Sequence, residues 1–358
     1  MNQSLHGLEI RKQLMGSLQS YHPTVNREKY HPSSYQNPNV GYLTALSKIS
    51  QITLRETMIG ELAAMGAALS WTISAMLYRR ALQQTKPISA NIVRLSSTSA
   101  VLLVFLVAMI TLGVTTNLRP DVIALAAASG IIGLGLGDTL YMVSLERIGV
   151  ARAVPITCTY PLFNLLWAVF LIGEPITLPL LSGVAVIFVG VWLLSHENLS
   201  SKGENRKSSS VTGIAAALVT AILWSISIAM MDIAVKNSAA TPSLGDAFVI
   251  NTLRTVTVAV LLLALSPIID RQHIFLKMKR RTAATLVIGG IVALAIGWFF
   301  LGYSFLEIPE SQAVPISSTT PLFSTLVGVF LLHEKVTARN MLGSIIVVAG
   351  IFLVFFIK

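Results

Sequence analysis

Ten apolar stretches of about twenty residues follow one another along this chain of 358 residues. A helix needs about that length to cross the roughly 30 Å of hydrocarbon in a bilayer. Backbone groups in lipid must pair internally, and a barrel would show alternating strands of about ten residues, so we predict an all-α membrane protein. The stretches lie near 59–78, 88–112, 121–142, 153–173, 177–195, 211–235, 246–269, 282–304, 312–332 and 338–357.

The composition indicates an integral membrane protein. Hydrophobic residues make up 54% of the chain and charged residues 12%, whereas soluble domains carry about 25% charged residues. The net charge of +10 does not predict nucleic-acid binding, because nearly all Lys and Arg lie in short loops or in the N-terminal tail. The one cysteine, Cys158, excludes an intramolecular disulfide. We expect the cell membrane, plasma or inner, as its location, and no metal ion or cofactor.

Residues 1–57 differ from the rest of the chain. They are polar, rich in Pro, Asn, Ser and Tyr, and lack the apolar core of a signal peptide. We therefore expect a largely disordered N-terminal extension. Met58, at the start of the first apolar stretch, is a second candidate for the start of translation.

One segment of the sequence occurs twice. AVPITCTYPLF at 153–163 returns as AVPISSTTPLF at 313–323, an offset of 160 residues. The first apolar stretch also has its copy, WTIS against WSIS, at an offset of 153. We predict two five-helix repeats, 58–195 and 211–358, joined by a polar linker at 196–210. Further matches at the offset of 160 are Asn91 with Asn251, Arg94 with Arg254, Pro161 with Pro321, Glu174 with Glu334, Gly183 with Gly343 and Gly190 with Gly350.

Because five is odd, the second repeat must enter the membrane inverted relative to the first. The loop charges agree, since basic residues follow the first and third helices of the first repeat but the second and fourth of the second. Two inverted halves can open in turn to opposite sides around a site near the midplane. This architecture predicts a transporter with alternating access. A larger scaffold built by duplication is the other explanation.

The chain resembles the EamA-domain permeases of the drug/metabolite transporter superfamily. The resemblance rests on PLFNLLWAVFLIGEPIT (161–177) and PLFSTLVGVFLLHEKVT (321–337), each followed by two glycines seven residues apart. It covers both repeats and implies ten helices around a central cavity, with export or exchange of small metabolites or drugs. It also implies cytoplasmic termini. The loops on one side of the membrane contain fifteen Lys and Arg and those on the other side contain two. Because basic loops stay cytoplasmic, this difference predicts that both termini lie outside. The absolute orientation therefore stays open.

Three charged residues lie well inside apolar stretches, away from their ends. Asp138 would cost at least about 2.5–3.5 kcal/mol there, so it is either a proton or cation site that couples transport to a gradient, or a structural acid paired with an arginine. Arg94 is about two turns into its helix, which favours a side chain that reaches the headgroups. Arg254 lies roughly 15 Å deep, where it needs either a partner or a water-filled cavity. Its candidate partners are an anionic group of the substrate and Asp138.

Other candidates have a structural explanation beside the functional one. Asn91 and Asn251 either extend a polar cavity wall or hold two helices together. Trp71 and Trp224 either line the cavity or pack at an interface. The hinge candidates are Pro161 and Pro321, because proline removes a backbone bond inside a helix. The resulting kink either bends a gate or is fixed and only shapes the packing. Structural roles are expected for Glu174 and Glu334 in hairpins, and for Gly183, Gly190, Gly343 and Gly350 in close helix packing.

The competing prediction is an enzyme. GLGD at 135–138 matches the G-x-G-D signature of intramembrane aspartyl proteases, whose chemistry needs two carboxylates that share a proton. The other acids near the apolar stretches sit at helix ends, namely Asp121, Asp232, Asp246 and Asp270. A second catalytic Asp is therefore missing, and the sequence favours transport over proteolysis, a channel or a receptor.

Overall fold

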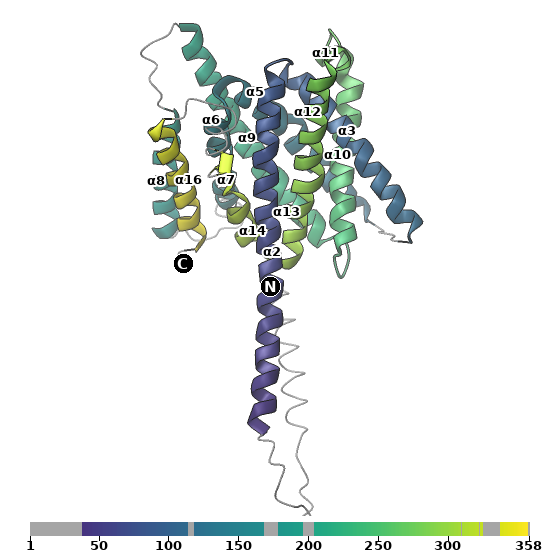
Figure 1. The fold of residues 1–358 in the computed structure, drawn as a ribbon, viewed down its shortest axis with the longest axis vertical. Helices are drawn as coiled ribbons and strands as arrows, with labels where there is room; N and C mark the ends of the chain where they lie inside the picture. Colours follow the sequence, from purple (N-terminus) through teal and green to yellow (C-terminus); the bar gives the residue numbers. More distant parts are fainter. Residues whose placement is uncertain are drawn as a thin grey trace, which may run out of the picture. The chain divides into compact units, whose positions relative to one another are not determined.

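A computed structural model describes residues 38–113, 118–167, 178–195, 204–308, 310–321, 323–324 and 337–356, and each element in these ranges is a helix (Figure 1). The chain divides into two units, residues 1–52 and 53–358. In the first unit, the described residues form the opening of helix α2 (Pro38–Leu82). The second unit contains the other described helices.

Helix α2 begins earlier than the apolar pattern predicts. It starts at Pro38, about twenty residues before the first apolar stretch. Proline is well tolerated at the first position of a helix, and neither glycine nor proline occurs between Tyr42 and Ile59 to interrupt it. The expected disorder of residues 1–57 is therefore wrong for residues 38–57, which belong to this helix. Residues 1–37 lie outside the described ranges, so for them the expected disorder stays a prediction.

Six helical runs are long and apolar enough to cross a membrane. They coincide with the first three stretches of each predicted repeat. Within the described residues they are α2 from Ile59, α3 (Pro87–Thr111), the run of α4 (Pro120–Gly130), η1 (Ile131–Gly137) and α5 (Asp138–Ile148), α9 (Glu204–Lys236) from Ser210, α10 (Leu244–Ile269), and the run of α12 (Arg280–Gly290), η4 (Ile291–Gly297) and α13 (Trp298–Glu307). The protein is therefore an all-helical integral membrane protein.

The other four stretches contain shorter described helices. These are α6 (Val150–Thr157), α7 (Tyr160–Trp167), α8 (Leu178–Ser195), α14 (Glu310–Ser317) and α16 (Ala338–Phe356); a short α11 (Ile274–Lys277) precedes α12. Residues 168–177 and 325–336 are not described. The predicted hairpin acids Glu174 and Glu334 lie in these gaps, outside the described residues. Thr337, at the edge of the second gap, accepts a hydrogen bond from the backbone N–H of Asn340 and so caps α16 (3.3 Å).

Two π-helical segments interrupt the third long helix of each repeat at matched positions. They are η1 and η4, offset by 160 residues. At their ends, the Asp138 N–H donates to the Gly133 carbonyl and the Trp298 N–H to the Ala293 carbonyl, five residues back in each case. A π segment adds a residue to the helical turn and leaves a carbonyl without its usual partner. The repeat thus includes a backbone feature that periodicity did not predict.

Helices α8 and α16 lie side by side and pack through the four predicted glycines (Figure 1). A Cβ on Gly190 would lie 3.0 Å from the Gly343 carbonyl oxygen, and one on Gly350 would lie 3.1 Å from the Gly183 carbonyl oxygen. The contact is thus reciprocal, with each helix presenting its glycines to the other's backbone. Small residues permit this close approach of two membrane helices.

The hinge candidates lie at helix starts and not inside helices. Helix α6 ends at Thr157, residues 158 and 159 form a turn, and α7 resumes at Tyr160, so Pro161 is its second residue. The second repeat breaks in the same way at 318–319, before Pro321. The expected kink is therefore a full break. Proline is accommodated there because the first turn of a helix has no backbone acceptor for an N–H.

Helix α9 of the second repeat packs against the first repeat. It packs against α4, η1, α5, α6 and α7, all from the first repeat. Ser129 donates to the Ser227 carbonyl (2.7 Å), and Ser227 donates to the Ser129 carbonyl (2.8 Å). A Cβ on Gly133 would collide with the Ser227 hydroxyl at 2.2 Å. The glycines of the third apolar stretch therefore admit a helix from the other repeat.

Candidate functional site

Side chains from both repeats enclose a cavity inside the second unit. The first repeat contributes α2, α3, α5, α6 and the break before α7, and the second contributes α9, η4 and the start of α13. The walls are formed mainly by aromatic and small polar side chains: Trp71, Ser74, Tyr78, Arg94, Asp138, Tyr141, Thr157, Cys158, Tyr160, Trp224, Ile228, Trp298 and Thr320. Four predicted candidates, Trp71, Arg94, Asp138 and Trp224, therefore share one cavity.

Asp138 lies at the centre of a buried polar cluster in this wall. One carboxylate oxygen pairs with Arg94 Nη2. The other accepts a hydrogen bond from Trp224 Nε1 at 2.8 Å. A carboxylate buried to 4% exposure needs such partners, because an isolated charge is very costly in a low dielectric. Asp138 is thus paired with an arginine, as the structural alternative from the sequence proposed.

The expectation that Arg94 reaches the headgroups is wrong. The residue is only 2% exposed. Its Nη2 pairs with Asp138, and its Nε donates to Asn91 Oδ1 at 2.8 Å. Its guanidinium also lies 4.9 Å from the centroid of the Tyr78 ring. Depth along the helix misled the prediction, because neighbouring helices cover this side chain at the level of the cavity.

Arg254, the repeat-matched arginine, has a different environment. It is fully buried, and the described residues provide no ion pair for it. Its guanidinium stacks 4.3 Å over the Trp298 ring, donates to Ser227 Oγ (3.1 Å) and contacts Met231 Sδ. Its Nε has no hydrogen-bond partner among the described residues. Arg254 does not itself line the cavity, but Trp298 does.

The two arginines therefore show how the repeats diverged at one position. Residue 298 is the repeat equivalent of residue 138, so the carboxylate beside Arg94 is replaced by an indole beside Arg254. An indole face attracts a guanidinium but carries no charge. Asp138 forms an ion pair with Arg94, whereas no described carboxylate pairs with Arg254. The buried set of two arginines and one aspartate carries one net positive charge.

The two predicted tryptophans occupy equivalent places against the opposite repeat. Trp224 contacts Gly137 at the end of η1, where a Cβ would lie 3.0 Å from its ring. Trp71 contacts Gly297 at the end of η4, where a Cβ would lie 2.8 Å from its Nε1. Trp71 also packs edge-to-face on Trp298, at 5.4 Å between centroids. Glycine at the end of each π segment thus makes room for a wall tryptophan.

Asn91 and Asn251 hold helices together and do not line the cavity. Each Nδ2 donates to a carbonyl of a π segment, that of Leu134 (3.1 Å) and that of Leu294 (2.8 Å). These two leucines are 160 residues apart. The asparagines therefore satisfy carbonyls where the π geometry weakens the regular backbone pairing. The sequence left two explanations open, a polar cavity wall and a contact that holds two helices together. The positions of Asn91 and Asn251 agree with the second.

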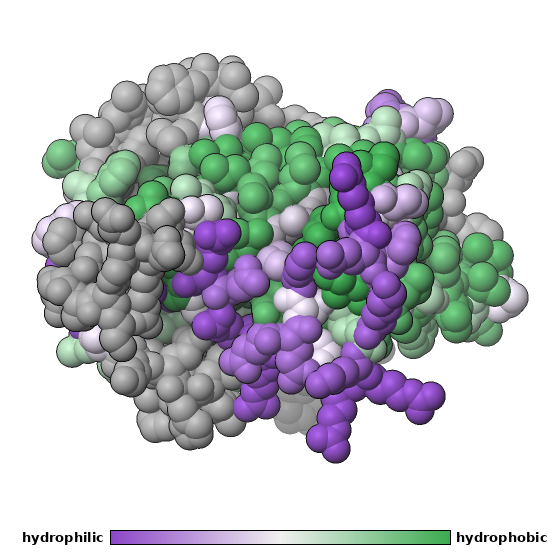
Figure 2. Space-filling model, turned by 90° about the horizontal axis from the view of Figure 1, so that it is seen from above, coloured by the Kyte–Doolittle hydropathy of each residue, from purple (hydrophilic) through white to green (hydrophobic). Residues whose placement is uncertain are grey.

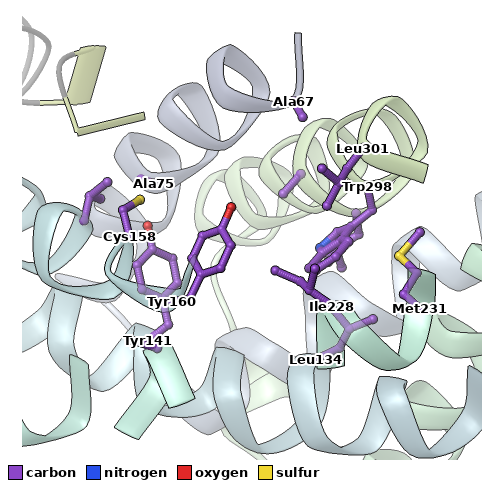
Figure 3. Close-up of a cluster of buried hydrophobic side chains, with 14 of the residues drawn as sticks. Ala67, Ala75, Leu134, Tyr141, Cys158, Tyr160, Ile228, Met231, Trp298 and Leu301 are labelled. Atoms are coloured by element: carbon purple, nitrogen blue, oxygen red, sulfur yellow. The ribbon is translucent and has the colours of Figure 1, made fainter. Parts of the chain in front are cut away.

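Sequence reasoning missed the aromatic part of the wall. Tyr141 and Tyr160 flank Trp224, at 5.0 and 6.3 Å between ring centroids. Figure 3 shows Tyr141, Tyr160 and Trp298 around one region of the core, with Ile228 between them. Tyr160 belongs to the duplicated segment, but Thr320 replaces it in the copy. The departures between the copies, Tyr160 for Thr320 and Asp138 for Trp298, were the available signal.

The helix breaks open onto the cavity. Thr157, Cys158 and Tyr160 line it from the first break, and Thr320 from the second. Tyr160 also shares a hydrogen bond with Ser317 across the repeats, at 2.9 Å between oxygens. The cavity volume is about 50 Å³. A water molecule needs roughly 10–15 Å³, so the cavity holds a few waters, and a metabolite requires the walls to separate.

The other predicted acids lie away from this cluster. Asp121 pairs with Arg119, and Asp232 with Lys236. Asp246 forms a capping box with Ser243, and Asp270 accepts from Ser89. Asp138 has no second carboxylate beside it among the described residues. The shared-proton dyad of an aspartyl protease is therefore missing from the described residues.

Comparison with known proteins identifies the family. The model of the EamA-like transporter family matches twice, at residues 58–196 and 211–356. An uncharacterized transporter of Archaeoglobus fulgidus is 24% identical over 83% of this chain and 98% of its own. "Putative ribose uptake protein RbsU" of Lactobacillus johnsonii is 26% identical over 60% of this chain and 72% of its own.

The fold has also been seen in a crystal. A solved protein structure is similar with a TM-score of 0.57 and 18% identity, over 82% of this chain and 95% of that one. The family match extends over most of the sequence and includes both predicted repeats. The chain therefore belongs to the EamA-like transporter family, whose members are membrane transporters and not enzymes.

Proposed function

We propose that this protein is a secondary transporter that moves one small molecule at a time by alternating access. In this proposal ten transmembrane helices form two five-helix repeats of inverted topology, located in the cell membrane. The matched π segments, glycines and asparagines support the pseudo-symmetry. The cavity supports the mechanism, because its walls come from both repeats and rocking of one repeat against the other would open it.

The substrate class follows from Arg254. We propose a small molecule that has one anionic group and a flat or apolar body. A buried arginine without a carboxylate partner is costly, and a monoanion would neutralise the net positive charge of the buried cluster. Trp298 separates Arg254 from the cavity, so its side chain would move as the substrate binds. The aromatic walls would stack on the body of the substrate.

Asp138 and Arg94 are the proposed coupling site. Protonation of Asp138 would remove the charge that holds Arg94 and free the guanidinium to turn toward the cavity. Trp224 contributes from the second repeat, because its indole N–H donates to the same carboxylate. Proton binding would therefore change a contact between the two repeats, which is what coupling of transport to a gradient requires.

A neutral sugar is the second candidate substrate. It is favoured by the printed name of the Lactobacillus johnsonii relative, which describes ribose uptake. Tryptophan and tyrosine faces also suit the apolar face of a sugar ring. A sugar would use Asp138 and the wall hydroxyls as hydrogen-bond partners, and would leave Arg254 without a counterion.

The test is untargeted mass spectrometry of medium and cell extract at matched membrane levels of each variant. Cells expressing wild type would be compared with Arg254→Gln, which removes the cation, and Arg254→Lys, which keeps it. Arg119→Gln is the control, because Arg119 is exposed and, within the described part of the chain, pairs with Asp121 at a helix start.

We expect wild type and Arg119→Gln to change the distribution of a monoanionic metabolite across the membrane. Arg254→Gln should leave that distribution unchanged, and Arg254→Lys should produce part of the wild-type change. Enrichment outside would indicate export, and enrichment inside uptake. A sugar that moves equally with wild type and Arg254→Gln would contradict the monoanion proposal. If the metabolites of cells with wild type and of cells without the protein do not differ in hosts of several genera, transport of a common metabolite is contradicted.

A further inference from the structure

A second hollow lies at the surface of the second unit, between the end of α2 and the start of α12. Its volume is about 450 Å³. Four basic side chains line it, Arg80 from α2 and Lys279, Arg280 and Arg281 from the start of α12. Its other lining residues are uncharged. Because the hollow gathers four positive charges from two helices, it has the electrostatic character of an anion site.

The backbone at this hollow also favours an anion. Helix α12 begins at Arg280, and Lys279 at its N-cap position makes no side-chain cap. The first N–H groups of a helix carry partial positive charge and are available to a ligand when no cap satisfies them. Thr282 donates to Gln84 Oε1 at 2.9 Å and so joins α12 to the turn that follows α2. Arg80 lines the hollow from the last turn of α2.

An apolar surface continues from the hollow along both helices. Arg281, Thr285 and Ile288 follow one another at helical spacing, so they lie on one stripe of α12. Ile288 is 55% exposed, and on α2 Ile73, seven residues before Arg80, is 46% exposed. Figure 2 looks onto this end of the second unit, where hydrophilic side chains gather beside a hydrophobic surface. A ligand with a charged head and an apolar tail would match both parts.

We propose that this hollow binds a phosphate group, supplied by the headgroup of an anionic membrane lipid. The phosphate would lie between Arg80 and the arginines of α12, and the acyl chains would lie against the exposed side chains of Ile288 and Ile73. Basic hollows between membrane helices suit anionic headgroups in this way. The contact links a helix of the first repeat to one of the second, so the lipid stabilises the conformation in which these two helix ends meet.

Binding is tested with the purified full-length protein by native mass spectrometry and by melting temperature in detergent. The probes are short-chain phosphatidylglycerol, phosphatidylcholine and inorganic phosphate. Arg280→Gln/Arg281→Gln removes two charges from the hollow. Arg271→Gln/Lys277→Gln removes two charges from the same connecting segment outside it, which controls for net charge.

We expect phosphatidylglycerol to bind and to raise the melting temperature of wild type and of the control, and to bind at least tenfold more weakly to the hollow variant. Equal binding to the two double variants would overturn the site. Inorganic phosphate that binds as tightly as phosphatidylglycerol would overturn the lipid source. If the double variant does not fold, Thr285→Asp provides the test, because it adds a negative charge inside the hollow and is expected to weaken phosphatidylglycerol binding.

Discussion

The pairing of Asp138 with Arg94 gives the sharpest prediction for stability. Both side chains are almost fully buried, at 5% and 2% exposure, so solvent does not screen their interaction as it does at a surface. Asp138→Asn keeps an oxygen for Trp224 Nε1 but removes the charge beside Arg94. An uncompensated buried charge costs about 3–5 kcal/mol. We expect Asp138→Asn to lower the free energy of unfolding by about that amount.

A double-mutant cycle isolates the charge pair from other effects. Arg94→Met in addition to Asp138→Asn removes the unpaired cation and keeps an apolar side chain of similar length, so most of the lost stability should return. The assay is unfolding by sodium dodecyl sulfate in mixed micelles, followed by far-UV circular dichroism. An Asp138→Asn variant as stable as wild type would refute the reasoning, as would a double variant whose loss equals the sum of the single losses.

Two further predictions concern contacts between the repeats. Gly350→Val should lower the free energy of unfolding by about 1–3 kcal/mol, because a Cβ there meets Ile187 Cγ1 at 2.7 Å and the Ile187 backbone N at 3.0 Å. The control is Ala349→Val, at the exposed neighbouring position of α16. Equal stability of the two variants would contradict the packing of α8 against α16. Trp224→Phe keeps an aromatic ring but removes the hydrogen bond to Asp138, which should lower the free energy of unfolding by about 1.5–3 kcal/mol. A variant with unchanged unfolding and unchanged transport would show that this bond contributes nothing.

The long helices could be predicted from the sequence because a membrane span has a simple requirement. About twenty apolar residues in a row are needed to cross the bilayer, and the six long helices coincide with six such stretches. The duplicated segments likewise predicted the family, because the matched residues could be compared directly. Length and repetition are properties of the chain itself, so no knowledge of helix contacts was needed.

The site was less predictable because it depends on which helices meet. Arg94 was expected at the headgroups from its depth along one helix, but α12 and α5 cover it. The π segments left no periodic signal, although the paired glycines Gly137 and Gly297 marked their ends. Side chains such as Tyr160 and Trp298 became wall residues only when the two repeats packed together. Positions where the repeats differ were better indicators of the site than positions where they agree.

The central claim is that the cavity opens in turn to the two sides of the membrane, and Cys158 allows a direct test. It is the one cysteine of the chain and lines the cavity at the first helix break. Its modification by a small, membrane-impermeant methanethiosulfonate reagent would be measured in right-side-out and inside-out vesicles. Alternating access predicts slow modification from both sides, with a Cys158→Ala variant unlabelled. Modification from one side only, at any reagent concentration, would contradict the account.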